Sequence, residues 1–258
     1  LEPFKGLFTQ GMVCHETFKI DNQWVSPDEV SSEDGKNYFL KRDPKKKVKV
    51  GPSESMSKSK KNTIDPEIMI ENYGADAVRF FILSDSPPEK DVQWSEQGML
   101  ASYKFVQKFW NLNSEILKIT NNKKDESKKF TENEIHIFTN EIIKKITFNL
   151  ENFHYNVIIA NFHEIYNFFY KLLQKNNFKS NELKINFVKI LKVIQTKKNH
   201  LIDECLVKFN EVHLVNWPEI DNKYLEQKKV NIVVQINGKK RGVIFCEKDI
   251  IEKDLIKI

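Results

Sequence analysis

The sequence predicts a mixed, mainly α-helical fold with more than one domain. Apolar residues recur at helical spacing through the second half of the chain, as in Tyr103, Val106 and Trp110, which is typical of helices with one buried face. Short strand-like runs separated by turn residues lie in the first part, and a second strand-turn-strand pattern lies near the end. The length of 258 residues fits about two domains or more with real cores.

The composition fits a soluble globular protein. Apolar residues make up 40% and charged residues 30% of the chain, which argues against disorder. The net charge of +5 is spread over many Lys and Glu residues, so composition supports a nucleic-acid partner only weakly. No run approaches the roughly 18 apolar residues of a membrane span, and we expect a cytoplasmic protein with no membrane association.

Metal sites and disulfides are not expected in this chain. Cys14, Cys205 and Cys246 lie far apart and form no C-x-x-C pair, which excludes a disulfide framework and a cysteine zinc site. The six histidines form no H-x-x-x-H pair. The chain begins at Leu1 rather than Met and ends at Ile258 inside a helix-like pattern, so we expect it to be part of a longer protein.

Strand-like runs at 17–20, 38–40 and 48–50 predict a small β region at about 15–50. A polar Ser/Lys segment follows at 53–62.

A helix is predicted to begin after this polar segment. Asp65, Pro66 and Glu67 are in order an N-cap, a first-turn proline and a first-turn acidic residue. The helix should end at Gly74, with Asp76 as the cap of the next helix.

Helical periodicity dominates from about Gly98 onward and predicts a bundle of four or five helices. Thr131 and Glu134 form a capping-box pattern after a charged break. Because the aromatic residues in these stripes repeat at helical spacing, we interpret them as core rather than as platforms for stacking bases. The main stripe residues are Ile135, Phe138, Ile142, Ile146, Leu150, Ile158, Phe162, Ile165, Phe169, Phe187, Ile190, Leu191 and Ile194.

The last part of the chain predicts a β-hairpin. Two extended runs at 230–236 and 239–245 flank Asn237-Gly238, the strongest short hairpin signal.

One short motif indicates chemistry. Residues 55–59 are Ser-Met-Ser-Lys-Ser, followed by Lys-Lys-Asn at 60–62. The segment resembles the KMSKS signature of class I aminoacyl-tRNA synthetases, and Gln-Gly-Met-Val at 10–13 and Tyr-Gly-Ala-Asp-Ala-Val-Arg-Phe at 73–80 also match the family. Lys-Lys-Asn and Val-Gln-Ile-Asn-Gly-Lys at 234–239 are similar to the bacterial leucyl-tRNA synthetases. The resemblance covers nearly the whole chain.

The resemblance implies three domains in a C-terminal fragment. Residues 1–97 would be the end of a class I Rossmann-type catalytic domain with a β insertion at about 15–50, and 98–225 a helical bundle of the anticodon-binding type. Residues 226–258 would begin a small α+β domain that binds tRNA. Such an enzyme activates leucine with ATP, and Mg²⁺ is expected with the ATP, before it transfers leucine to tRNA(Leu). The HIGH signature and the editing domain are absent from this sequence, so we expect the chain alone to be inactive. We also expect a monomer.

Within the signature, Lys58 is the residue that we expect to be catalytic. In the family, lysines of this loop reach the triphosphate as negative charge builds on it, and removing one such interaction commonly costs roughly 10²–10³ in rate. Ser55 stands where the family has its first lysine, while Lys58 matches the second. Lys60 or Lys61 is a candidate to compensate for Ser55.

Further ATP-binding residues follow from the same resemblance. They are Met56, Ser57 and Ser59 in the signature, with Gln10, Gly11 and Met12 in the upstream match. The alternative for the signature is a solvated Ser/Lys loop, which a five-residue match alone would favour. The alternative for residues 10–12 is an ordinary strand end.

Lys239, Lys240 and Arg241 follow the hairpin turn, and we expect them to contact tRNA phosphates. The alternative is a solvated hairpin end. Residues 196–200 replace a junction that contains proline in the family, which leaves the geometry there open.

Two other functions remain open on the sequence alone. One is a noncatalytic tRNA-binding module, although a retained Lys58 in a family-like loop argues against it. The other is a synthetase for isoleucine or valine, since these relatives share the general plan.

Overall fold

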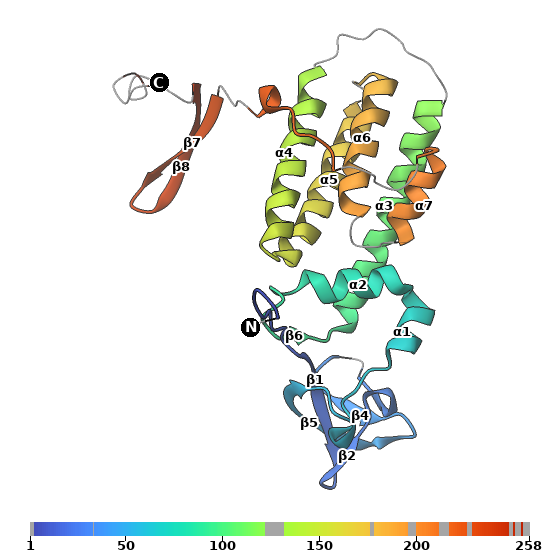
Figure 1. Cartoon of the computed structure of the whole chain (residues 1–258). Helices are drawn as coiled ribbons and strands as arrows, with labels where there is room; N and C mark the ends of the chain where they lie inside the picture. Colours follow the sequence, from blue (N-terminus) through green and yellow to red (C-terminus); the bar gives the residue numbers. More distant parts are fainter. Residues whose placement is uncertain are drawn as a thin grey trace.

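The computed structural model describes residues 3–32, 34–121, 132–175, 178–195, 200–211, 217–225, 229–247, 250 and 254. A small sheet, a pair of short helices and a helical bundle follow one another from the bottom to the top of Figure 1. A separate hairpin stands beside the bundle. The mixed, mainly α-helical fold predicted from the sequence is confirmed.

The sheet is curled and largely antiparallel, with strand order β2-β1-β5-β4-β3. Short β6 pairs in parallel with β1. The core of the sheet consists of Phe18, Val25, Val30, Leu40 and Val48. The strand bounds are β1 Val13–Ile20, β2 Gln23–Val25, β3 Val30–Ser31, β4 Tyr38–Leu40, β5 Asp43–Ser55 and β6 Val92–Gln93.

β5 is longer than the predicted run at 48–50, because pairing with β1 continues it into the polar segment. Cys14 pairs with Ser55 in this ladder, and Glu16 pairs with Ser53. The register shifts next to Thr17, opposite Gly51, where an added Cβ would lie 2.4 Å from the Thr17 hydroxyl oxygen. Glycine therefore allows the two backbones to approach at this bulge.

Helices α1 (Pro66–Tyr73) and α2 (Ala75–Ser84) join the sheet to the bundle. The predicted start and end of α1 are correct: the Asp65 carboxylate accepts from the Glu67 amide at 2.9 Å, and Gly74 has φ of 80°.

Two neighbouring phenylalanines of α2 pack in different directions, one against the bundle and one against the segment after β6. Phe80 packs edge-on against Phe162 of α5 with ring centroids 4.9 Å apart. Phe81 packs against Trp94 at 5.1 Å, in a second cluster with Ala77 and Met99. Adjacent residues thus tie α2 to both neighbouring units.

The prediction that Asp76 caps α2 is wrong. Gly74 is the N-cap of α2, and Asp76 lies in the first turn. Its carboxylate instead accepts from the backbone amides of His200 at 3.3 Å and Leu201 at 2.7 Å, at the start of α7. Arg79 also donates to it at 2.8 Å. The cap is made across the fold rather than within the local sequence.

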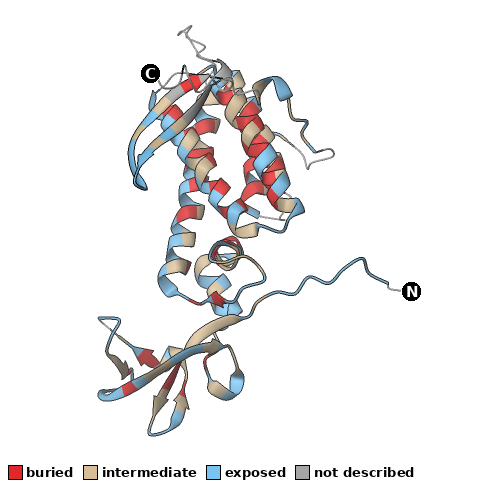
Figure 2. Cartoon of the chain, turned by 90° about the vertical axis from the view of Figure 1, so that its left-hand side faces the viewer, coloured by how far each residue is buried: buried red, intermediate tan, exposed pale blue. Residues whose placement is uncertain are grey.

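In the described part of the chain, five helices surround the main core, which Figure 2 shows as buried residues on the facing sides of the helices. Phe109, Phe169 and Phe187 are fully buried there. The helices are α3 Glu96–Asn121, α4 Glu132–Glu151, α5 Tyr155–Lys175, α6 Ser180–Ile194 and α7 His200–Lys208.

Two sequence expectations concern residues outside the described part of the chain. The capping box at Thr131 and Glu134 is one, because Thr131 is not described. The junction at 196–199 is the other.

The predicted hairpin is present as β7 (Lys229–Ile236) and β8 (Lys239–Glu247). Both turn residues have positive φ, 51° at Asn237 and 74° at Gly238, as a type I′ turn requires.

The segment before the hairpin is fixed to α4. The Trp217 indole donates to the Thr147 hydroxyl at 3.1 Å, and the Asp221 amide donates to the Asn140 side chain at 2.8 Å. The short helix η4 (Asn222–Tyr224) begins directly after Asp221. None of the helices in the described residues has the length and apolar character that crossing a membrane requires.

Candidate active site

The loop with the signature connects β5 to α1. The Met56 amide donates to the Val13 carbonyl at 3.0 Å, so the loop leaves the sheet beside the start of β1. A short helix, η2 (Lys58–Lys60), follows with Ser57 as its N-cap, and it ends at Lys61, which has φ of 53°. The left-handed residue reverses the chain toward α1.

Asn62 holds the two ends of this loop together. Its side chain is fully buried, and its Oδ1 accepts from the Ser57 amide at 2.8 Å. Its Nδ2 donates to the carbonyls of His15 and Glu54, each at 3.2 Å. From the sequence, Asn62 was recognisable only as a mark of the family. Asparagine side chains often form hydrogen bonds to nearby backbone groups, and this tendency is the one signal in the sequence that could have indicated the role of Asn62.

The lysines of the loop have different surroundings. Lys60 forms an ion pair with the Glu54 carboxylate. Lys58 and Lys61 are exposed, and within the described residues no carboxylate lies at ion-pair distance from either ammonium group. Lys58 and Lys61 can therefore meet an incoming anion without giving up a partner.

Gly11 is a close-packing position. Its amide donates to the Pro88 carbonyl at 2.8 Å, and an added Cβ would lie 2.1 Å from the Lys90 carbonyl oxygen. This close approach explains the glycine without a ligand. Gly11 lies just before β1, and this packing requires a glycine there whether or not a nucleotide binds nearby.

The segment 10–12 nevertheless adjoins the signature loop. The Met12 amide donates to the Asp91 carboxylate at 2.8 Å, and the next residue, Val13, accepts from Met56. Gln10 and Met12 are exposed. The structure thus brings both predicted ATP-binding segments to the same end of β1.

Met56 and Ser59 contribute to loop geometry in different ways. The Met56 side chain is half-buried against the cluster that contains Phe81 and Trp94. The hydroxyl oxygens of Ser57 and Ser59 are 2.8 Å apart. Met56 therefore anchors the loop, while the serines stabilise the turn around Lys58.

The basic residues of the hairpin do not join this loop. Lys239, Lys240 and Arg241 are all exposed and lie at the start of β8. Figure 1 shows the hairpin beside the bundle, apart from the sheet that carries the loop. If these three residues bind a ligand, they do so on a surface separate from the signature loop.

Burial also perturbs two reactive side chains away from this loop, Cys205 and His163. Burial raises the pKa of the Cys205 thiol to about 12, so it stays protonated and a poor nucleophile. Burial also lowers the pKa of His163, beside Lys108. No group of three His, Cys, Asp or Glu side chains in the described part of the chain is placed to hold a metal ion.

Two family profiles match this chain. "tRNA synthetases class I (I, L, M and V)" matches residues 49–95, which include the signature loop, α1 and α2. "Anticodon-binding domain of tRNA ligase" matches residues 132–250, from α4 into the hairpin.

Curated relatives with the name leucine-tRNA ligase are similar over most of the chain. The protein of Bartonella tribocorum is 39% identical over 94% of this chain and 29% of its own length. The protein of Bradyrhizobium diazoefficiens is 37% identical, again over 94% of this chain and 29% of its own length. The chain thus spans less than a third of the length of these relatives.

A solved structure has a similar fold. It is the ternary complex of Agrobacterium radiobacter K84 agnB2 LeuRS with tRNA and LeuAMS. The TM-score is 0.65 with 23% sequence identity, over 79% of this chain and 27% of that one.

Proposed function

We propose that this chain, a member of the leucyl-tRNA synthetase family of class I aminoacyl-tRNA synthetases, supplies the ATP-facing loop and the tRNA-docking units of a leucine-tRNA ligase. The observation that carries the proposal is the exposed Lys58 ammonium, which lacks an ion-pair partner within the described residues, on a loop whose two ends are fixed by Asn62. The identity of 36–39% to leucine-tRNA ligases supports leucine over isoleucine or valine.

The proposed reaction is the activation of leucine. A carboxylate oxygen of leucine forms a bond to the α-phosphorus of ATP, and the bond from that phosphorus to the pyrophosphate oxygen breaks. Negative charge increases on the leaving pyrophosphate. Lys58 would stabilise that charge, because a cation held at the place where charge develops lowers the barrier.

The other loop residues would position this cation. Ser57 and Ser59 would fix the turn, Met56 would anchor it, and Gln10, Gly11 and Met12 would lie beside the nucleotide. The family implies Mg²⁺ with the triphosphate, but the described residues offer no ligand set for it.

We further propose a division of labour along the chain, in a cytoplasmic, monomeric enzyme. Residues 1–97 would serve catalysis, while the bundle at 98–225 and the domain that begins at 226–258 would dock tRNA(Leu). The profile match to an anticodon-binding domain supports the second part.

The test is leucine-dependent exchange of pyrophosphate into ATP. We expect pyrophosphate exchange by the protein encoded by a longer reading frame that contains this chain. We expect none by the purified 258-residue chain, which covers 29% of the length of the Bartonella tribocorum relative. Exchange by neither protein, with tRNA binding retained by both, would instead identify a noncatalytic tRNA-binding module. Exchange that depends on isoleucine or valine would overturn the choice of leucine.

A further inference from the structure

We propose that Asn62 is a positioning residue for the activation step, because its side-chain amide sets where the loop presents Lys58. The inference rests on the proposed function of the loop. It adds a residue whose effect on the reaction is exerted through another side chain.

The amide of Asn62 bonds in opposite directions. Its oxygen accepts from the Ser57 amide at 2.8 Å, at the start of the loop. Its nitrogen donates to the His15 carbonyl of β1 and to the Glu54 carbonyl of β5, both at 3.2 Å. One buried group therefore joins two strands and the beginning and end of the loop.

Only an amide of this length meets these requirements. A carboxylate at position 62 would place a negative oxygen, in the position of Nδ2, against two carbonyl oxygens. An apolar side chain would leave the Ser57 amide and both carbonyls without this partner, which costs free energy wherever water cannot replace it. The exposed fraction of Asn62 is 0%, so the structure offers little access for such water.

The link to Lys58 is a single peptide unit. Ser57 is the N-cap of η2, and Lys58 is the first residue of that short helix. Holding the Ser57 amide thus fixes the origin and direction of the turn. The Lys60–Glu54 ion pair also supports the loop, but its side chains are 37% and 34% exposed, so solvent weakens its contribution.

A displacement of about 1 Å in a catalytic group can cost roughly 10²-fold in rate. We therefore expect Asn62→Ala to act mainly on the rate of adenylate formation. ATP binding in the ground state should change by only a few-fold, since most of the nucleotide contacts lie in the rest of the enzyme.

The experiment is a double-mutant cycle in the full-length synthetase, measured by single-turnover adenylate formation over a range of ATP concentrations. Asn62→Ala should lower the maximal rate by about 10- to 100-fold. In the Lys58→Ala background it should cost little more, because residues that act as one unit are not additive. Asn72→Ala, which changes an exposed asparagine on α1, is the control and should leave the rate unchanged.

The outcomes separate this inference from the proposed function. A small effect of Lys58→Ala would overturn the catalytic role of Lys58. A large effect of Lys58→Ala together with a full, independent loss from Asn62→Ala would overturn the positioning role of Asn62.

A second variant and a second measurement cover the case in which Asn62→Ala does not fold. Asn62→Ser is smaller and cannot span both sets of partners, so the same cycle applies to it. In the 258-residue chain, either variant that folds should exchange the Ser57 amide hydrogen roughly 10-fold faster than wild type. An unchanged rate of hydrogen exchange would contradict the proposal that the Asn62 side chain holds the Ser57 amide.

Discussion

At the scale of single residues, the main difference lies between Lys58 and Lys60. Both are close in sequence, yet Lys60 is paired with Glu54, and Lys58 extends from the loop without an ion-pair partner in the described structure. An unpaired cation can respond to charge that develops during a reaction. A paired cation must first leave its carboxylate neighbour.

We therefore expect Lys58→Ala in the full-length enzyme to lower the rate of adenylate formation by roughly 10²-fold or more, a barrier increase of about 3 kcal/mol. Its effect on ATP affinity should be smaller. Lys61→Ala should cost more than Lys60→Ala if Lys61 compensates for Ser55, because Lys60 is already occupied by Glu54.

Single-turnover kinetics on the three lysine variants decides the matter. A Lys58→Ala rate within a few-fold of wild type would overturn the proposed catalytic role of Lys58. A larger loss from Lys60→Ala than from Lys61→Ala would show that the ion pair with Glu54 opens during the reaction.

Gly11 allows a matched test of close packing. Gly11→Ala would place a methyl group 2.1 Å from the Lys90 carbonyl oxygen, whereas a Cβ at Gly6 meets nothing within 4 Å. We expect Gly11→Ala to destabilise the chain by roughly 1–3 kcal/mol, since backbone must move to relieve the overlap. Gly6→Ala should have almost no effect. Thermal unfolding of the two variants measures the difference, and equal midpoints would contradict the close approach.

The candidate site could be predicted only in part from the sequence. Lys58 is recognisable because its neighbours form a local motif. The role of Asn62 is not, because its carbonyl partner on His15 lies 47 residues away. Hydrogen bonds between distant segments leave no periodic or local pattern.

At the scale of elements, Asp76 connects α2 to α7. The carboxylate receives amides from His200 and Leu201, 124 and 125 residues further along the chain. α2 follows the signature loop by way of α1, while α7 closes the bundle. These hydrogen bonds therefore join the part of the chain that is proposed to serve catalysis to the helices that are proposed to dock tRNA.

Asp76→Ala should remove the cap of α7 and lower the stability of the chain by about 1–2 kcal/mol. Chemical denaturation of the 258-residue chain measures the change. Glu71→Ala is a suitable control, because Glu71 is an exposed acidic residue on α1. Equal losses from both variants would mean that the carboxylate of Asp76 does not hold α7.

Local signals predicted elements well wherever the stabilising partner is also local. Asp65 caps α1, and Asn237 and Gly238 form the hairpin turn, as their types and order indicate. Asp76 has the same kind of side chain as Asp65 but caps a distant helix. Composition at the start of a helix cannot distinguish these two cases.

At the scale of the whole molecule, burial is unequal between its parts. The bundle has a large continuous core, whereas the sheet encloses a small one around Phe18 and Leu40. A third cluster with Phe81, Trp94 and Met99 fastens the sheet end to α2. The helical spacing of apolar residues predicted the bundle. The attachment of the sheet to α2 could not be predicted in this way, because it depends on tertiary contacts between residues that have no regular spacing in the sequence.

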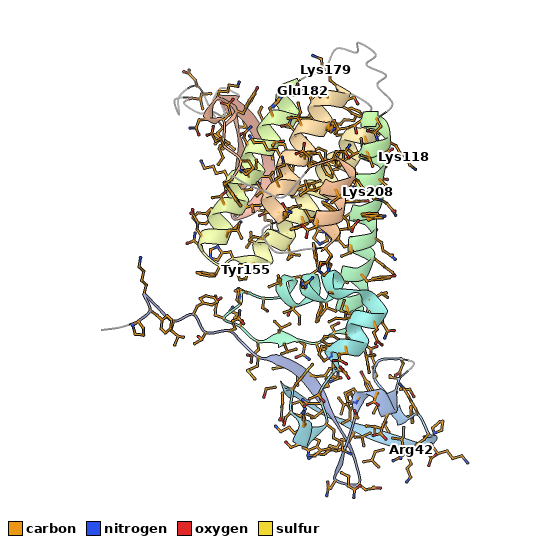
Figure 3. The ribbon with its side chains drawn as sticks, turned by 45° about the vertical axis from the view of Figure 1, so that its right-hand side comes forward. Arg42, Lys118, Tyr155, Lys179, Glu182 and Lys208 are labelled. Carbon is orange, nitrogen blue, oxygen red and sulfur yellow. The ribbon has the colours of Figure 1, made fainter. Side chains whose placement is uncertain are left out.

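Charged side chains are exposed along the whole length of the molecule. Figure 3 marks Arg42 at the end of the sheet and Lys118 and Lys208 on the bundle. Arg42 pairs loosely with Glu29 at 3.9 Å, and the Lys208 ammonium lies 3.9 Å from the Trp110 ring centre. Weak binding of a polyanion could therefore come from several surfaces, and a test of the hairpin must separate position from total charge.

We expect the 258-residue chain to bind tRNA weakly, with an affinity that falls steeply as salt rises. Replacing Lys239, Lys240 and Arg241 together by Ala should weaken binding and reduce the salt slope by about one for each phosphate that is no longer neutralised.

The control replaces the exposed lysines at 45–47 of β5, which removes the same charge from another strand. Filter binding at several salt concentrations gives both slopes. A smaller loss of affinity in the control supports hairpin docking, whereas equal losses would mean that binding follows total charge, and salt-independent binding would rule out phosphate contacts as its source.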